Sequence, residues 1–139
     1  PMPPTKWNGK YSLVRYAAQK TGTSLAARQS EPTFSDVYTF STDCSSGTCI
    51  STVLHGPTPK NPTLPLPPRY TWDGSRWVHI YDWQWIAIWE KGSEGVGAGT
   101  VVGVYAPQPD GTLRGTWLTQ IAGGPCNGTV LMDVAAFPA

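Results

Sequence analysis

Aromatic side chains dominate the part of the chain that could bind a ligand. Five of the seven tryptophans fall within the eighteen positions 72–89. A tryptophan ring combines a large apolar body with an N–H donor, and it suits ligands that are partly apolar and partly hydroxylated. The predicted ligand-binding residues are the aromatic side chains of this stretch and one polar neighbour: Trp77, Tyr81, Trp83, Gln84, Trp85 and Trp89.

The same stretch has a second interpretation, which we favour. Tryptophans at alternate positions of a strand fill the core of a small barrel, with their indole nitrogens hydrogen-bonded at its edges. The residues concerned are Trp77, Trp83, Trp85, Trp89 and Trp117. Under this interpretation the tryptophans form the core, whereas under the first interpretation some of them line an open pocket or groove that binds the ligand.

Residues suited to catalysis are sparse. Asp82 and Glu90 flank the aromatic run on the same strand parity. Eight residues of unbroken strand would separate them by about 26 Å, whereas glycoside cleavage needs carboxylates roughly 5–9.5 Å apart. His79 has aromatic neighbours and no sequence partner, which is typical of a half-exposed strand residue. The sequence therefore predicts no enzyme, no cofactor and no metal.

The cysteines predict one disulfide. Cys44 and Cys49 bracket Ser-Ser-Gly-Thr, with strand-like residues 37–40 before and 50–54 after. Facing residues of a non-hydrogen-bonded antiparallel pair have Cα atoms about 4.5 Å apart, which a disulfide tolerates. A zinc site using Cys44, Cys49, His55 and Cys126 is the alternative, but its spacing matches no common zinc motif. Cys126 is left as a free thiol or as half of an intermolecular bridge.

Strands joined by turns must position these residues. Residues 7–16 alternate between large apolar and polar groups, and Asp73-Gly74-Ser75 predicts a hairpin between 69–72 and 76–81. Residues 17–34 predict a long connection with room for one short helical turn. The run 77–89 is long for one strand, so we expect a bend near 82–84 that divides it into two. Residues 92–99 predict a flexible connection.

The predicted fold is all-β. The chain holds 15 glycines and 14 prolines, and its strand-like segments number about eight. This count allows a small antiparallel barrel, with a strongly bent sandwich as the alternative. Residues 56–68 contain six prolines and cannot join a central sheet. We expect this proline-rich loop to cover one end of the barrel, and a proline-rich ligand for another protein is the less favoured interpretation.

The length and charge of the chain indicate a single domain that does not bind nucleic acid. A chain of 139 residues fits one domain, so residues 1–139 are predicted to form a single extracytoplasmic β-domain, with 1–5 as a linker remnant. The formal net charge is +1 and the basic residues are scattered, which excludes an electrostatic surface for nucleic acid. No apolar run reaches the roughly 20 residues that span a bilayer.

Five short motifs resemble one actinobacterial extracytoplasmic domain type. They are Trp-Asn-Gly-Lys-Tyr-Ser-Leu at 7–13, the Cys44–Cys49 hairpin with the residues from Phe40, the 70–77 hairpin, Asp-Gly-Thr-Leu-Arg-Gly at 110–115 and Pro-Cys-Asn-Gly at 125–128. The type occurs in mycobacterial secreted or membrane-anchored proteins and in the sensor tails of some serine/threonine kinases. The resemblance implies an envelope location and a non-catalytic sensing role. Domains of this type often have a second cysteine pair, and Cys126 lacks a partner for one.

The sequence thus predicts a non-catalytic binding or sensing domain of the cell envelope, secreted or membrane-anchored, with an envelope lipid or glycan as its ligand. One alternative is a protein-interaction domain, such as a membrane kinase's extracellular tail, that forms homodimers or binds a membrane protein. The other is a carbohydrate-binding module.

Overall fold

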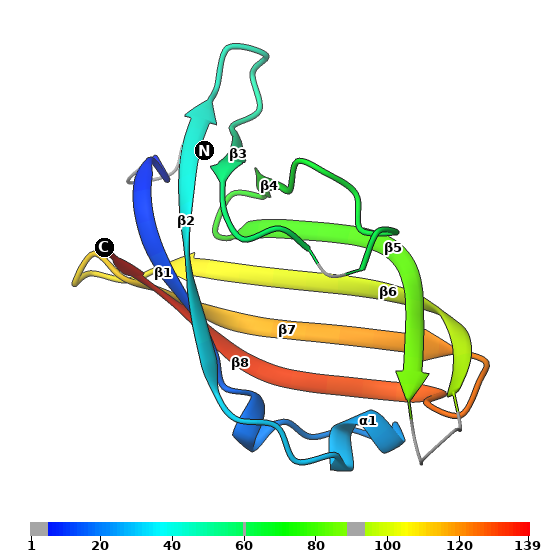
Figure 1. Ribbon diagram of the computed structural model, residues 1–139. Coiled ribbons are helices and arrows are strands. Elements are labelled where there is room, and N and C mark those ends of the chain that lie inside the picture. The colour runs from blue at the N-terminus through cyan, green and yellow to red at the C-terminus, as the bar shows by residue number, and fades with distance from the viewer. Residues whose placement is uncertain (1–5, 60, 89–93) are drawn as a thin grey trace.

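Eight antiparallel strands close into a barrel in the computed structural model, which describes residues 6–59, 61–88 and 94–139 (Figure 1). Each strand pairs with its neighbours in the chain, and the last pairs with the first. The prediction of a small all-β barrel is confirmed, and the sandwich alternative is not what forms. The predicted linker remnant, residues 1–5, lies outside the described residues. The strands are β1 Gly9–Arg15, β2 Phe34–Asp43, β3 Ile50–His55, β4 Arg69–Trp72, β5 Trp77–Ile88, β6 Glu94–Pro107, β7 Leu113–Ala122 and β8 Gly128–Pro138.

Strand β1 places its odd positions inside the barrel. Leu13 is buried and stands opposite Asp36 of β2, while Arg15 stands opposite Phe34. Side chains directly opposite on paired strands lie on the same face. The alternation predicted for residues 7–16 therefore continues through Arg15, and this arginine shares the inner face with apolar neighbours.

The connection between β1 and β2 carries two short helical segments where one turn was expected. They are η1 (Ala17–Gln19) and α1 (Leu25–Arg28), and Ser24 caps α1 by accepting a hydrogen bond from the Ala26 amide at 3.1 Å. Helix α1 packs against β8 across one end of the barrel (Figure 1). Its Ala26 joins Ile121, Cys126 and Val130 in a small second core. None of the described helices is long and apolar enough to cross a membrane.

Strand β5 remains one strand, contrary to the expectation that it divides near residues 82–84. It keeps an unbroken register with β6 from Trp77 opposite Tyr105 to Ile88 opposite Glu94, and it curves strongly along its length (Figure 1). Strand β6 already begins at Glu94, so most of the predicted flexible connection 92–99 is strand.

The glycines of β6 make room for indole rings. A Cβ atom added at Gly99 would lie 2.6 Å from Trp83 Nε1, and one added at Gly103 would lie 2.5 Å from Trp117 Cε3. Glycine in a strand commonly marks such a close approach. Glycine at positions 99 and 103 therefore lets the aromatic core pack directly on the backbone of β6.

An aromatic cluster forms the main core of the barrel. The Trp7 ring stacks on Phe40 with centroids 3.9 Å apart and meets the rings of Tyr70 and Tyr105 at 5.1 and 5.3 Å. Trp77 is fully buried in the same cluster. The favoured interpretation of the tryptophans as core residues is correct for Trp77 and Trp117. The predicted hydrogen bonding at the edges does not hold for Trp77, because its Nε1 has no partner in the described part of the chain.

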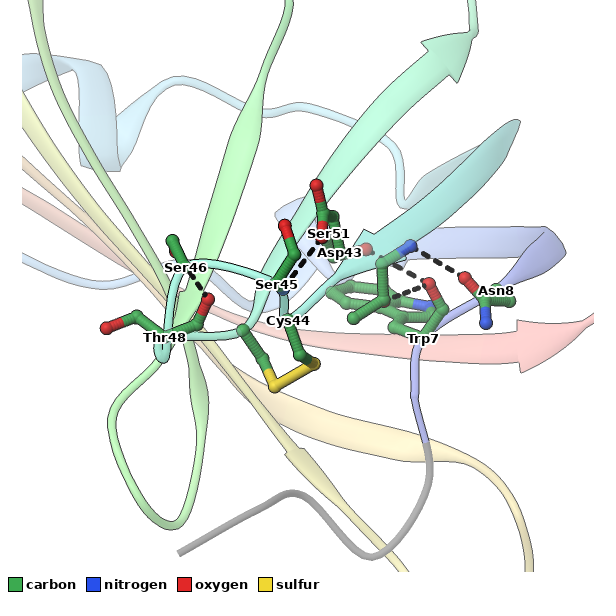
Figure 2. Close-up of a disulfide and its surroundings, with 10 residues drawn as sticks. Trp7, Asn8, Asp43, Cys44, Ser45, Ser46, Thr48 and Ser51 are labelled. Atoms are coloured by element: carbon green, nitrogen blue, oxygen red, sulfur yellow. Dashed lines mark hydrogen bonds between the residues drawn. A yellow bond between two sulfur atoms is a disulfide. The ribbon is translucent and has the colours of Figure 1, made fainter.

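The predicted disulfide joins Cys44 and Cys49, whose Cα atoms are 4.0 Å apart (Figure 2). The adjacent hairpin also holds the segment before β1. Thr42 Oγ1 and Ser51 Oγ donate to the Trp7 carbonyl at 2.7 and 3.0 Å. The hairpin thus fixes the beginning of the described chain to one end of the barrel.

Candidate ligand-binding site

The shortest strand pairing in the barrel is the one between β4 and β5. Strand β4 is four residues long and pairs with β5 only at Thr71–Val78 and Trp72–Trp77. Further along β5, the proline-rich loop supplies side-chain hydrogen bonds to one residue. Asn61 Nδ2 donates to the Gln84 carbonyl at 2.7 Å, and the Gln84 amide donates to Thr63 Oγ1 at 3.0 Å. These bonds satisfy backbone groups that a longer β4 would have paired, and they hold the loop along the edge of β5.

A cavity of about 1070 Å³, partly open to solvent, extends into the barrel next to this loop. Its wall comes from β1, β2, β3, β4, β5 and β7, and the remainder from the loop and from Glu31 and Pro32. Pockets for small ligands typically measure roughly 300–1,000 Å³. The cavity is thus large enough for a sizeable ligand, and the proline-rich loop borders it as a cover over the barrel interior.

Arg15 is the basic residue that the inner face of β1 carries into this cavity. Its guanidinium carbon lies 4.2 Å from the centroid of the Trp117 ring and 5.9 Å from that of Phe34. Stacking on an aromatic face stabilises a guanidinium without neutralising it. The ion pairs found among the described residues are Lys20–Glu31 and Arg76–Asp73, and neither of them involves Arg15.

Tyrosine rings surround this arginine. Tyr38, Tyr70 and Tyr81 line the cavity. Burial raises the pKa of Tyr81 to about 12, and it raises the pKa of Tyr38 and of Tyr70 as well. The nearby Tyr105 hydroxyl is buried and has no hydrogen-bond partner among the described residues. All these hydroxyls therefore remain protonated at neutral pH and can donate hydrogen bonds.

His79 is buried, whereas the sequence predicted a half-exposed residue. It is 7% exposed and packs between Tyr70 and Tyr81, with ring centroids 4.8 and 4.6 Å away. Burial, assisted by the positive charge of Arg15, lowers the pKa of His79 to about 4. The ring is thus neutral at pH 7. Its Nδ1 lies 2.9 Å from the Arg69 carbonyl, which can only accept, so Nδ1 carries the proton and Nε2 is an acceptor.

The predicted ligand-binding residues do not form one surface. Tyr81 lines the cavity, Trp77 is fully buried in the core, and Trp83 is half-buried against it. Gln84 is exposed on the opposite face of β5. Trp85 pairs with Gly97 in the strand, and its side chain, like the whole of Trp89, lies outside the described residues.

Sequence reasoning missed Arg15 and Trp117 as cavity residues. The available signal was an arginine at an odd position of β1, in register with the apolar residues Trp7, Tyr11 and Leu13. A lone charge on the apolar face of a strand is unusual, since charged groups are rarely buried without a partner. The odd position of Arg15 in the strand was therefore enough to predict that its side chain faces the barrel interior. The strands that it faces there could not be predicted.

The remaining candidate groups lie elsewhere. Asp82 is exposed and accepts a hydrogen bond from Thr100 Oγ1 at 2.9 Å, and Glu90 is outside the described residues. Cys126 is a free, buried thiol of the second core, apart from the bonded pair Cys44–Cys49. No cluster of three or more metal-ligating side chains occurs in residues 6–59, 61–88 and 94–139.

No protein-family model and no curated protein sequence matches the chain. Solved structures do match. The monomer form of the Mycobacterium tuberculosis PknI sensor domain aligns over 99% of this chain and 90% of its own, with a TM-score of 0.66 and 17% identity. The dimer form of the same sensor domain aligns over 78% of this chain and 73% of its own, with a TM-score of 0.57 and 22% identity. The chain therefore shares the fold of that mycobacterial sensor domain.

Proposed function

We propose that this chain is a non-catalytic extracytoplasmic sensing domain that binds its ligand inside the barrel. The cavity beside the proline-rich loop carries this proposal. It is a concave space, partly open to solvent, that six strands and one loop line, and it has the size of a pocket for a small ligand. Similarity in fold to a domain described as a kinase sensor adds support for a sensing role.

The extracytoplasmic location rests on two observations. The chain contains the Cys44–Cys49 disulfide, and disulfides persist mainly in oxidising compartments. The solved structures of similar fold are described as sensor domains. Together they favour a secreted or membrane-anchored protein of the cell envelope, of which an extracellular kinase tail is one form.

The lining favours a lipid over a glycan. Leu13, Val53, Leu64 and Leu66 contribute apolar side chains to the cavity, together with several prolines. The alternative of a carbohydrate-binding module needs flat aromatic rings at the surface. Of the tryptophans whose side chains are described, four are buried and Trp83 is half-buried. The cavity is therefore the better candidate for the binding site, and an apolar chain is the better candidate for what fills it.

Binding of the neutral fluorescent probe N-phenyl-1-naphthylamine tests this function. We expect saturable binding that the change Val53→Phe weakens at least about tenfold, because Val53 lines the cavity and the larger ring occupies its space. The matched control is Val37→Phe, since Val37 is 51% exposed on the neighbouring strand. If both variants bind like the wild type, or if the wild type does not bind, the cavity is not the site.

Homodimerisation is the second candidate function. One of the similar solved structures is described as a dimer form, and this chain exposes apolar side chains at Val37, Leu54 and Ile80. Cys126 is a poor link between subunits because its thiol is buried. Sedimentation equilibrium in oxidising and reducing buffer tests this function. A dimer that persists on reduction would support a non-covalent interface, and a strict monomer at all concentrations would exclude it.

A further inference from the structure

We propose that Arg15 is an anion-binding residue and that the cavity accepts an amphiphile with an apolar chain and one carboxylate or phosphate group. This inference rests on the proposed binding function and specifies its ligand chemistry. It follows from the charge of Arg15, from the hydrogen-bond donors around it and from the apolar remainder of the cavity.

Arg15 is half-buried in the cavity wall, and no ion pair with a described residue neutralises its charge. Its guanidinium stacks on Trp117, and no carboxylate in the described part of the chain lies within ion-pair distance of it. A partly desolvated cation without a counter-ion attracts an incoming anion more strongly than a fully hydrated one does. The planar guanidinium also matches the geometry of a carboxylate or phosphate, because it can donate two parallel hydrogen bonds.

The neighbouring polar groups are mostly donors. The hydroxyls of Tyr38, Tyr70 and Tyr81 are protonated at neutral pH and belong to rings that line the same cavity. Hydroxyl donors assist a guanidinium in binding an anion and add no competing charge. His79 is neutral there, so it adds no second positive charge, and Arg15 remains the cationic group of this inner region.

Two acidic residues, Glu31 and Asp36, also line the cavity. Glu31 is exposed and pairs with Lys20 at 2.9 Å, so its charge is offset. Asp36 is half-buried and makes no described ion pair. It is the one lining carboxylate that could compete with a bound anion for Arg15. Removing its charge should therefore strengthen anion binding or leave it unchanged.

The rest of the lining suits an apolar chain. Leu13, Phe34 and Val53 lie on the strands, and Leu64 and Leu66 lie on the proline-rich loop. An anionic group at Arg15 would thus leave the remainder of the molecule among apolar side chains, where burial of its CH₂ groups is favourable. The arrangement combines one polar end and one apolar region in a single cavity.

The test is competition against N-phenyl-1-naphthylamine with dodecanoate, dodecyl phosphate, dodecanol and dodecyltrimethylammonium, all below their micelle concentrations. We expect at least one of the two anions to bind about tenfold or more tighter than dodecanol, and the cation to bind weakest. Dodecanoate and dodecyl phosphate together show whether the site prefers carboxylate or phosphate.

Variants assign the effect to Arg15. Arg15→Met should remove the advantage of the anions while dodecanol still binds, and Arg15→Lys should retain part of it. Arg114→Met is the matched control, because Arg114 stacks on Phe137 at 5.6 Å and does not line the cavity. Asp36→Asn should bind the anions at least as tightly as the wild type. Circular dichroism checks that each variant is folded.

The outcomes separate the two proposals. If dodecanol competes as well as the anions, or if Arg15→Lys and Arg15→Met keep the full preference for anions, the inference about Arg15 is wrong and the cavity remains a binding site. If no amphiphile competes and the neutral probe itself does not bind, both proposals fail.

Discussion

At the scale of single residues, one region inside the mostly apolar barrel carries two polar side chains, Arg15 and His79. Arg15 and His79 both line the cavity among tyrosine rings, and each makes a stabilising contact within the protein. Their parity on β1 and β5 could be predicted from sequence. Their shared place in one cavity could not, because it depends on the barrel closing between strands that are far apart in the chain.

The buried imidazole predicts a pH dependence of stability. The pKa of His79 is lowered from 6.5 to about 4 on folding, so the unfolded chain binds the proton more tightly. Stability from this group is complete above pH 6.5 and decreases as the pH falls toward 4. The full loss amounts to roughly 3 kcal/mol. Urea unfolding at about pH 7 and about pH 4.5, on either side of the pKa of free histidine, measures it.

The variant His79→Gln is the control for this prediction. Glutamine does not titrate, so its free energy of unfolding should change less between these two pH values than that of the wild type. Asp43, Asp73 and Asp110 also have lowered pKa values, which arise from hydrogen bonds in their turns, and they contribute equally in both proteins. An identical pH dependence in the two proteins would contradict the burial of His79.

At the scale of elements, hairpins were predictable because their signals are local. Asp73-Gly74-Ser75 and the Cys44–Cys49 turn lie where the sequence placed them. Gly97 and Gly99, in the first part of β6, were misjudged as parts of a flexible connection, because the reason for them lies on other strands, whereas Gly103 was predicted to lie in a strand. Gly99 faces Trp83 of β5, and Gly103 faces Trp117 of β7.

Gly103→Ala should displace the Trp117 ring on which Arg15 stacks. The added methyl group would lie 2.5 Å from Trp117 Cε3, so the indole must move. We expect a loss of about 1–3 kcal/mol in the free energy of unfolding, and weaker binding of N-phenyl-1-naphthylamine. Ala98→Val is the control, because Ala98 is exposed on the same strand. Equal stability of Gly103→Ala and wild type would show that Trp117 does not pack on this backbone.

The disulfide is predicted to contribute little to global stability, because it links two residues that are close in the chain. It closes a short loop, with a sequence separation of 5, so reduction should lower the free energy of unfolding by only about 2 kcal/mol. Chemical denaturation of the wild type with and without dithiothreitol measures this difference. The double variant Cys44→Ala/Cys49→Ala should not respond to the reductant. A response in that variant would implicate Cys126 instead.

At the scale of the whole molecule, composition and turn spacing predicted the barrel but not its interior space. About eight strands in a chain rich in glycine and proline allow a closed sheet. Whether such a barrel is filled or hollow depends on side-chain volumes summed over all its strands, and on the short β4 that leaves β5 to the proline-rich loop. Neither can be derived from one segment at a time.

Isotope-edited NMR of the protein with dodecanoate tests the central claim most directly. We predict nuclear Overhauser effects from the ligand chain to Leu13, Tyr81 and Trp117, which line the cavity, and a shift of the Arg15 Nε–H signal. Contacts confined to the exposed residues Val37 and Ile80, which do not line the cavity, with no change at Arg15, would contradict a ligand site inside the barrel.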